Sequence, residues 1–277
     1  MIKTFFRQII VALLRFEARL VLWRYKPKIV AVTGNVGKTS AKDAIALGLK
    51  LKATVRESKK SFNSEIGVPL TILGLPNAWN NPFAWLKNII HGFSLIVSRA
   101  PYPEWLVLEV GADRVGDIKS LARWLRPHIA VLTSLPEVPV HVEFFPSPES
   151  LFAEKGSLLA AVRPGGTVII NQDDERVRGV LDKLINEKKL AGKKIVRIGW
   201  SDSADIKINN DHLALDPTGA PNGIACKVDY AGHTIPLRLT ELYGSHQLYA
   251  VLFGLAVGIS LDYPLLSLAE RLETYAP

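Results

Sequence analysis

The stretch that decides the fold is A-V-T-G-N-V-G-K-T-S, at residues 31–40. The β-branched and apolar residues 29–32 predict a buried strand, and a helix is expected to begin at Lys38. Gly34 and Gly37 allow the intervening backbone to turn tightly and approach an anion closely. Free N–H groups and the positive dipole end of the helix favour a phosphate group there. We therefore predict a nucleoside triphosphate site, with Lys38 on the outer phosphates and Thr39 on a magnesium ion. Its residues are Thr33, Gly34, Asn35, Gly37, Lys38, Thr39 and Ser40.

This motif is shorter than the general phosphate-loop pattern. That pattern requires a glycine five positions before Gly37, where this chain has Val32. The alternative is a glycine-rich turn between strand and helix that happens to precede Lys-Thr. We favour the nucleotide site, because the flanking strand and helix are the context that phosphate binding needs.

The composition is that of an ordinary globular protein. The 277 residues, 48% hydrophobic and 22% charged, suffice for one large domain or two modest ones. The single cysteine, Cys226, excludes a disulfide framework and a cysteine-based metal site, and it suits a reducing compartment. No convincing secretory signal is present, so a cytoplasmic location is expected.

Much of the net charge of +8 lies near the N-terminus, where residues 1–27 predict a basic amphipathic helix. On a helical wheel, Lys3, Arg7, Gln8, Arg15 and Arg19 oppose Ile9, Leu13, Phe16 and Leu20. Residues 1–26 could therefore contact an anionic membrane peripherally, at its inner face. The alternative is a helix that packs on the rest of the protein or on a partner. Nucleic-acid binding is not expected, because no stripe of basic and aromatic residues continues beyond this segment.

The remainder alternates strand and helix patterns. Strands are predicted at 105–110, 128–135, 167–171 and 194–200, and helices at 38–50, 83–97, 116–125, 147–162 and 174–189. This order predicts an α/β, P-loop NTPase-like three-layer fold, in which helices cover both faces of a mainly parallel sheet. Residues 56–64 are expected to form a loop. Residues 205–240 predict a small region of antiparallel β-hairpins with turns at 209–211, 216–219 and 231–232, followed by helices at 244–260 and 264–274.

Polar residues follow three of these strands, and the carboxyl ends of parallel strands meet at one edge of a sheet. They are Glu109, then His141 and Glu143, then Asn171, Asp173 and Asp174. Such side chains could hold magnesium directly or through water. For Glu109 the alternative is a salt bridge to Arg114 or Arg123. For His141 it is a loop histidine that does not act as a metal ligand, and for Asp173 and Asp174 it is a turn and a helix cap.

With these motifs in order, the chain resembles the Mur ligases, the ATP-dependent ligases of peptidoglycan precursor synthesis. Its blocks are most similar to those of the members that add D-alanyl-D-alanine. The blocks are T-G-N-V-G-K-T-S (33–40), F-N-S-E-I-G-V-P-L-T-I-L (62–73), E-V-G-A-D-R-V-G-D-I (109–118), P-V-H-V-E-F-F (139–145), F-A-E-K (152–155), I-I-N-Q-D-D (169–174) and G-S-H-Q (244–247).

The resemblance implies a set of roles. ATP and Mg²⁺ are the implied cofactors, and the catalytic residues would be Lys38, Glu109, His141 and Lys155. The metal ligands would be Thr39, Glu109, His141 and Lys155, the last carbamylated by carbon dioxide. The alternative for Lys155 is an ordinary exposed lysine of a helix. Asn171, Asp174 and His246 would contact the nucleotide, and Asn63 and Ser64 would lie on the substrate side. The chain departs from the family pattern at Ser64, Gln247 and Ala250, which bears on base recognition.

The implied reaction is ATP-dependent amide formation between a carboxylate and an amine through an acyl phosphate. Its substrates would be ATP, an acceptor such as a UDP-muramoyl peptide, and an amino acid or dipeptide. Residues 28–277 would be the central ATP-binding domain. The C-terminal ligase domain that the family has is not among these 277 residues, so either the sequence is a fragment or a partner supplies that domain. Two alternatives are a folylpolyglutamate or poly-amino-acid ligase of this architecture, and a non-catalytic nucleotide-binding module that recruits a partner at the membrane.

Overall fold

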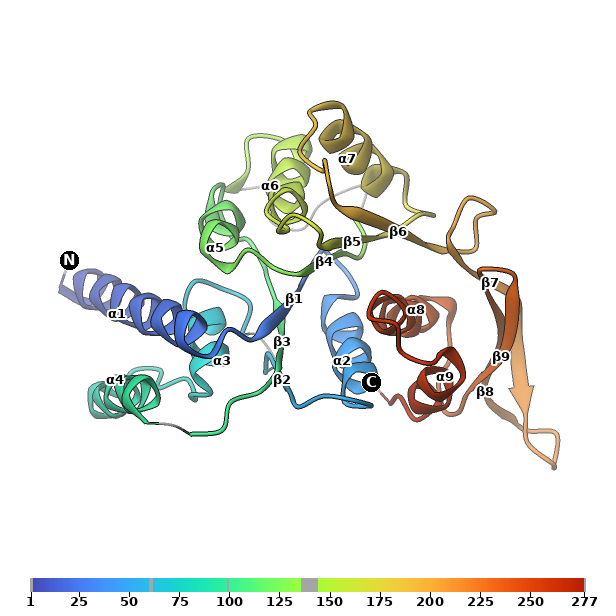
Figure 1. Cartoon of the computed structure of the whole chain (residues 1–277), viewed down its shortest axis with the longest axis horizontal. Helices are drawn as coiled ribbons and strands as arrows, with labels where there is room; N and C mark the ends of the chain where they lie inside the picture. Colours follow the sequence, from blue (N-terminus) through green and yellow to red (C-terminus); the bar gives the residue numbers. More distant parts are fainter. Residues whose placement is uncertain (1, 60–61, 99, 136–143, 277) are drawn as a thin grey trace.

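The architecture is built on one nine-stranded sheet, which the computed structural model describes for residues 2–59, 62–98, 100–135 and 144–276. Its strand order is β2-β3-β1-β4-β5-β6-β7-β8-β9 (Figure 1). The strands from β2 to β7 pair in parallel, and the last two pairings are antiparallel. The bounds are β1 (Lys28–Thr33), β2 (Val55–Glu57), β3 (Trp105–Glu109), β4 (Ile129–Leu132), β5 (Thr167–Asn171), β6 (Lys194–Gly199), β7 (Ile206–Leu215), β8 (Pro221–Tyr230) and β9 (His233–Leu239).

Helices cover both faces of this sheet, and each face has its own apolar core. One core includes side chains of α2, α8 and α9, around which β7, β8 and β9 bend (Figure 1). The other includes side chains of α1, α3, α5, α6 and α7. The helices are α1 (Ile2–Tyr25), α2 (Lys38–Leu49), α3 (Gly67–Leu73), α4 (Pro82–Val97), α5 (Asp117–Leu125), α6 (Pro148–Ala160), α7 (Glu175–Asn186), α8 (Ser245–Ile259) and α9 (Leu265–Glu273). The predicted three-layer α/β fold is confirmed.

The central strands are buried on both faces, as their continuous apolar runs predicted. In β1, Val30 and Val32 enter the α2 core, while Ile29 and Ala31 enter the opposite core. The parallel order brings the carboxyl ends of β1, β3, β4 and β5 to one edge, since all four strands run in the same direction. The phosphate-loop motif begins at that edge, directly after Thr33.

Two local predictions were wrong. Residues 209–211 do not form a turn but a bulge within β7, where the pairing with β8 shifts register and Asn210 adopts φ 50°. Arg56 and Glu57, predicted in a loop, belong to β2, whose pairing with β3 was not visible in so short a polar segment. The hairpin region itself is not a separate unit, because β7 pairs with β6 and so extends the parallel sheet.

The N-terminal helix packs through a different face from the one that the wheel predicted. Among residues 7–25 of this helix, Leu14, Glu17, Ala18 and Val21 are buried, whereas Phe16 is exposed. The guanidinium of Arg15 donates to the Ser120 carbonyl oxygen at 3.3 Å, so the basic side of the helix faces α5. Within the described residues, no helix is long and apolar enough to cross a membrane.

Candidate nucleotide-binding site

The loop between β1 and α2 has the backbone that its glycines allow. Gly34 adopts φ 147°, and a Cβ there would lie 2.0 Å from Thr133 Oγ1. Gly37 adopts φ 79° and is the left-handed cap from which α2 begins. Both positions therefore require glycine for their backbone conformation, and Gly34 requires it for space as well. The first amide groups of α2 remain free of side-chain caps, as at anion-binding helix ends.

The loop is fastened to the end of β4. The Asn35 amide donates to the Ser134 carbonyl at 2.8 Å, and Thr133 Oγ1 donates to the Val36 carbonyl at 2.7 Å. Lys38 folds back, and its ammonium donates to the Asn35 carbonyl at 3.0 Å. Burial lowers the pKa of Lys38, and the nearby Glu109 charge partly opposes that shift. The loop is thus held in shape before any phosphate binds.

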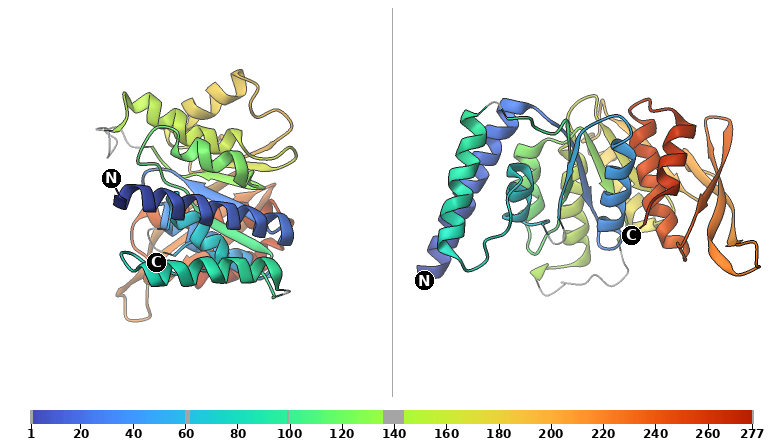
Figure 2. Two further views of the ribbon diagram at one scale, coloured as in Figure 1. Left: turned by 90° about the vertical axis from the view of Figure 1, so that its left-hand side faces the viewer. Right: turned by 90° about the horizontal axis from the view of Figure 1, so that it is seen from below.

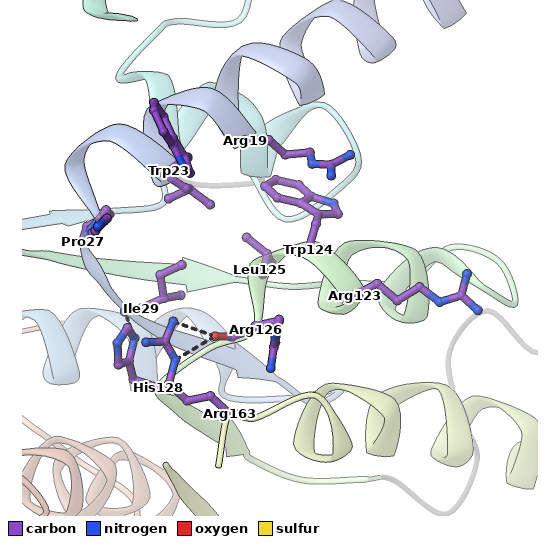
Figure 3. Close-up of a pocket in the computed structure, with 12 residues that line it drawn as sticks. Arg19, Trp23, Pro27, Ile29, Arg123, Trp124, Leu125, Arg126, His128 and Arg163 are labelled. Atoms are coloured by element: carbon purple, nitrogen blue, oxygen red, sulfur yellow. Dashed lines mark hydrogen bonds between the residues drawn. The ribbon is translucent and has the colours of Figure 1, made fainter. Parts of the chain in front are cut away.

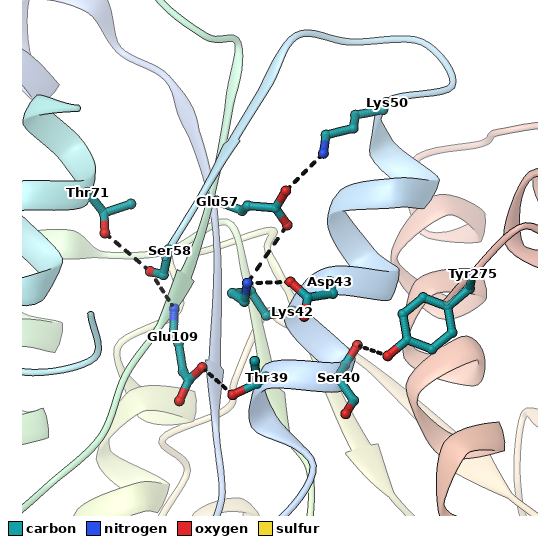
Figure 4. Close-up of polar contacts among 10 residues, drawn as sticks. All are labelled: Thr39, Ser40, Lys42, Asp43, Lys50, Glu57, Ser58, Thr71, Glu109 and Tyr275. Carbon is teal, nitrogen blue, oxygen red and sulfur yellow. Dashed lines mark hydrogen bonds and ion pairs between the residues drawn. The ribbon is translucent and has the colours of Figure 1, made fainter. Parts of the chain in front are cut away.

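Glu109 is the acidic centre of the site (Figure 4). Its carboxylate accepts from Thr39 Oγ1 at 2.9 Å and from Asn63 Nδ2 at 3.2 Å. The Glu109 amide donates to Ser58 Oγ at 3.1 Å, which fixes this strand end against β2. A carboxylate beside the first hydroxyl of the helix is a donor set that suits Mg²⁺, which binds few protein oxygens together with phosphate and water. A salt bridge from Glu109 to an arginine is not seen among the described residues.

Lys155 comes from α6 but reaches the phosphate loop. Its side chain is only 4% exposed, and its ammonium donates to the Gly34 carbonyl at 2.8 Å. Burial, and then the charge of Lys38, lowers the pKa of Lys155 to about 7. The interpretation of Lys155 as an exposed helix lysine is therefore wrong. The sequence alone gave no reason for its burial, because a lysine in a helix is usually solvated.

The remaining predicted residues lie at more varied places. Asp174 caps α7, accepting from the Arg176 and Val177 amides, and it also accepts from the Leu135 amide at 2.8 Å. Asn171 is buried at the end of β5, where it accepts from the Asp173 amide at 3.0 Å. These bonds fit the alternative of a turn and helix cap, and nucleotide contact by either residue stays a prediction.

On the substrate side, Asn63 touches Glu109 directly, and Ser64 lines an adjoining cavity with Gly111 and Arg114. His246 is exposed near the start of α8. Ala250 belongs to the same helix, and its side chain is buried in the apolar core. His141 lies outside the described residues, so its predicted role as a metal ligand stays untested.

Sequence reasoning missed the residues that support the site. Ser58 and Thr133 hold Glu109 and the loop, yet no motif marks either hydroxyl. Asp173 was singled out from the sequence as a possible magnesium ligand, but its supporting role was not predicted: it accepts from the Trp200 and Ser201 amides and from the Tyr249 hydroxyl. Ser58 meets Glu109 through the pairing of β2 with β3, and Thr133 reaches the loop through the pairing of β4 with β1. The pairing of β5 with β6 brings Asp173 to the end of β6.

A second support lies behind the helix start (Figure 4). Lys42 pairs with Asp43 and lies 3.9 Å from Glu57, which ties α2 to β2. The Tyr275 hydroxyl donates to the Ser40 carbonyl at 3.3 Å, so the segment after α9 contacts the first turn of α2. Both contacts restrain the first turns of α2.

Comparison with known proteins places this geometry in a family. Residues 90–258, more than half of the chain, match the family described as Mur ligase middle domain. A UDP-N-acetylmuramoyl-tripeptide–D-alanyl-D-alanine ligase of Mycobacterium leprae is 26% identical over 257 residues, which are 90% of this chain and 43% of that protein. The Bacillus subtilis ligase of the same name is 28% identical over 57% of this chain and 29% of its own length. The chain thus spans less than half the length of these relatives.

Solved structures agree in fold. MurF from Acinetobacter baumannii has a TM-score of 0.74 at 19% identity, over 97% of this chain and 50% of that one. MurF from Thermotoga maritima, solved with ADP, has a TM-score of 0.72 at 20% identity, over 97% of this chain and 52% of that one. A folylpolyglutamate synthetase from L. casei has a TM-score of 0.61 at 16% identity, over 94% and 67%. From the matched middle domain, the chain belongs to the Mur ligase family.

Proposed function

We propose that this chain is the nucleotide-binding part of an ATP-dependent carboxylate–amine ligase of peptidoglycan precursor synthesis. The observation that carries the proposal is the contact between Thr39 and Glu109, at 2.9 Å, beside the preformed loop. The names of the relatives support a reaction that joins a carboxylic acid to an amine, and the Thermotoga structure with ADP supports an adenine nucleotide as cofactor.

The proposed reaction has two steps. A carboxylate oxygen of the acceptor attacks the γ-phosphorus of ATP, the bond to the β,γ-bridging oxygen breaks, and ADP leaves. The amine nitrogen then attacks the acyl carbon, an amide forms, and phosphate and a proton are released. The chain would contribute mainly positioning and stabilisation of the phosphoryl charge, as in other phosphoryl transfers.

Each loop residue has a role in this proposal. The free backbone amides around Gly37, Lys38 and Thr39 would bind the phosphates, and the Lys38 ammonium would leave the Asn35 carbonyl to meet the outer ones. Thr39 and Glu109 would hold Mg²⁺, with His141 as a further ligand. A magnesium ion held by these residues would neutralise negative charge on the phosphates. Asn171, Asp174 and His246 would surround the rest of the nucleotide.

Lys155 is proposed to become a carbamate. Its neutral amine nitrogen would attack the carbon of CO₂, and loss of a proton would leave an anion. The change converts a buried cation next to Lys38 into a group that offers oxygens to Mg²⁺. Its burial and its 2.8 Å contact with the Gly34 carbonyl support a role beside the phosphates.

The acceptor side is proposed to lie next to Glu109. Asn63 and Ser64 border a cavity there, and the resemblance favours a UDP-muramoyl peptide as acceptor and an amino acid or dipeptide as amine. A folylpolyglutamate or poly-amino-acid ligase has the same architecture. A panel of acceptor acids separates these activities, and a non-catalytic module would turn over none of them.

We also propose a cytoplasmic location with peripheral membrane contact through residues 1–26. The cationic residues of α1 and its exposed apolar side chains support that contact.

The activity test combines nucleotide turnover with product detection. The chain is incubated with Mg·ATP, UDP-muramoyl tripeptide and D-alanyl-D-alanine, while ADP release and amide formation are followed. Since the chain spans less than half of its relatives, we expect bound nucleotide and only slow amide formation. Robust amide formation would refute the second expectation. ADP release that is unchanged in Glu109→Gln would contradict the proposed metal site.

A further inference from the structure

One end of the molecule carries a surface of exposed apolar side chains, to which α1 and α4 both contribute. Phe83 is 82% exposed, Val97 80% and Trp23 74%. The surface, called the outer apolar face below, comprises Ile9, Phe16, Trp23, Phe83, Leu86, Ile90, Phe93 and Val97. Its α4 members recur every three or four residues and therefore lie along one side of that helix. Large apolar side chains gathered on one part of a protein surface mark an interaction site.

The two helices form one layer. The Tyr25 hydroxyl donates to the Leu95 carbonyl at 2.9 Å, which joins the end of α1 to α4. The buried Glu17 lies directly against Gly92, where an added Cβ would be 2.1 Å from Glu17 Oε2. Figure 2 shows α1 and α4 side by side across this end of the molecule. The outer apolar face is therefore a feature of a helix pair, and α4 supplies the larger share of it.

Cations flank this face, whereas exposed carboxylates are missing from both helices. Residues 66–103 contain no Asp or Glu, and the one acid of α1, Glu17, is fully buried. Arg7 pairs with Glu65 at 3.1 Å. In the part of the chain that the structure describes, no ion pair is formed by the other nearby cations, which are Arg15, Arg19, Arg24, Lys26 and Lys87. The helix pair is thus apolar outward and positive at its border.

A cationic cavity opens where α1 meets the end of α5 (Figure 3). Its volume is about 540 Å³, no carboxylate lines it, and its cationic side chains are Arg19, Lys26, Arg123, Arg126 and Arg163. Trp23, a member of the outer apolar face, also lines it. Burial, and then the charges of Arg163 and Lys28, lowers the pKa of His128 to about 4, so this ring is neutral at neutral pH. Arginines without a counter-ion at the edge of an apolar surface suit a phosphate group.

An anionic bilayer is the partner whose chemistry matches both features. Apolar side chains can enter the boundary between headgroups and acyl chains, while arginines and lysines contact lipid phosphates. A second copy docked by a two-fold axis would instead bring the same cationic borders together, which is electrostatically unfavourable.

We propose that α1 and α4 form a membrane-docking surface, in which the outer apolar face enters an anionic bilayer and the cationic cavity binds a lipid phosphate. This inference rests on the proposed membrane contact of residues 1–26 and extends it to α4 and the cavity. It is independent of the proposed ligase activity.

The first test measures binding to lipid vesicles. The full chain is co-sedimented with vesicles of phosphatidylglycerol and phosphatidylcholine, and with phosphatidylcholine alone. We expect binding to the anionic vesicles that weakens as salt rises. Ile90→Asp and Phe93→Ser should each lower the affinity at least tenfold. The matched control is Leu213→Asp, a half-exposed leucine of β7 at the opposite end of the molecule, which should bind like the original chain (Figure 1).

The second test addresses the cavity with variants of equal charge. Arg19→Gln with Arg123→Gln removes two lining cations, and Lys188→Gln with Lys227→Gln removes two exposed ones elsewhere. We expect the first pair to weaken vesicle binding several-fold more than the second. Equal loss in both pairs would overturn the phosphate site. Inorganic phosphate that binds the cavity without any vesicle binding would assign it to a soluble anion and overturn the lipid assignment.

The outcomes separate this inference from the proposals on which it rests. If no vesicle is bound, the membrane contact of residues 1–26 fails together with it. If the chain binds but Ile90→Asp and Phe93→Ser bind equally well, α4 is not involved and only this inference fails. A dimer that Ile90→Asp abolishes, without vesicle binding, would assign the face to self-association. Stabilisation by Mg·ATP should persist in every variant, so the nucleotide site is judged separately.

Discussion

Replacing Glu17 by glutamine should stabilise the protein at neutral and alkaline pH. Glu17 is 0% exposed, and neither carboxylate oxygen has a hydrogen-bond partner within the described residues. Burial raises the pKa of this carboxyl from 4.5 to about 7. The folded protein therefore keeps a proton that the unfolded chain releases, and stability falls as the pH rises from about 4.5 to 7.

The size of the effect follows from that shift. One pKa unit corresponds to about 1.4 kcal/mol, so the rise from 4.5 to about 7 costs at most about 3 to 4 kcal/mol above pH 7. A glutamine side chain cannot ionise and should escape this cost, while its amide meets the same buried surroundings as the protonated acid. For a chain of this length, 1 kcal/mol corresponds to roughly 2 °C, so the melting temperature should differ by up to about 7 °C.

The assay is thermal denaturation of both proteins between pH 5 and pH 8. Glu17→Gln should gain stability relative to the original chain as the pH rises, and the two curves should converge near pH 5. Glu270→Gln, at an exposed site on α9, serves as the control, and its stability should follow that of the original chain at every pH. A constant difference between Glu17→Gln and the original chain at all pH values would refute the reasoning.

Three further results are expected. Gly34→Ala should abolish nucleotide binding in a titration, because the new Cβ would lie 2.0 Å from Thr133 Oγ1; retained affinity would contradict the loop geometry. Asp173→Asn should lower the free energy of unfolding in urea by about 2 kcal/mol or more, since it weakens three hydrogen bonds to a carboxylate, whereas Tyr249→Phe removes only one and should cost about half as much. Equal costs would argue against that network. ¹³C-labelled bicarbonate should give a carbamate resonance that Lys155→Gln lacks, and a resonance that persists in this variant would exclude Lys155 as its source.

Much of the fold was predictable because local patterns and tertiary packing agree. The apolar runs of β1 and β3 are buried on both faces, and Ser147 caps α6 as the sequence Ser-Pro-Glu predicts. Asn209-Asn210-Asp211 shows the limit of such reasoning. Its residues favour a turn, but the pairing of β7 with β8 continues before and after them and holds them in a bulge.

The site was predictable in its loop and not in its supports. The roles of Gly34, Gly37 and Thr39 were predictable from the chemistry of phosphate binding. The contact of Thr39 with Glu109 was predictable because α2 begins at the sheet edge where β3 ends. The burial of Lys155 depends on how α6 lies over the loop, which no local pattern encodes. The orientation of α1 was also hidden, because apolar residues occur on both its packed and its exposed sides.

The most direct test of the nucleotide site is the melting temperature with and without Mg·ATP, in bicarbonate buffer. At one hundred times the dissociation constant, binding adds about 2.7 kcal/mol, which corresponds to roughly 5 °C here. We expect a rise of that order in the original chain and none in Lys38→Ala. No rise at saturating Mg·ATP, or an equal rise in Lys38→Ala, would contradict a nucleotide site at residues 33–40.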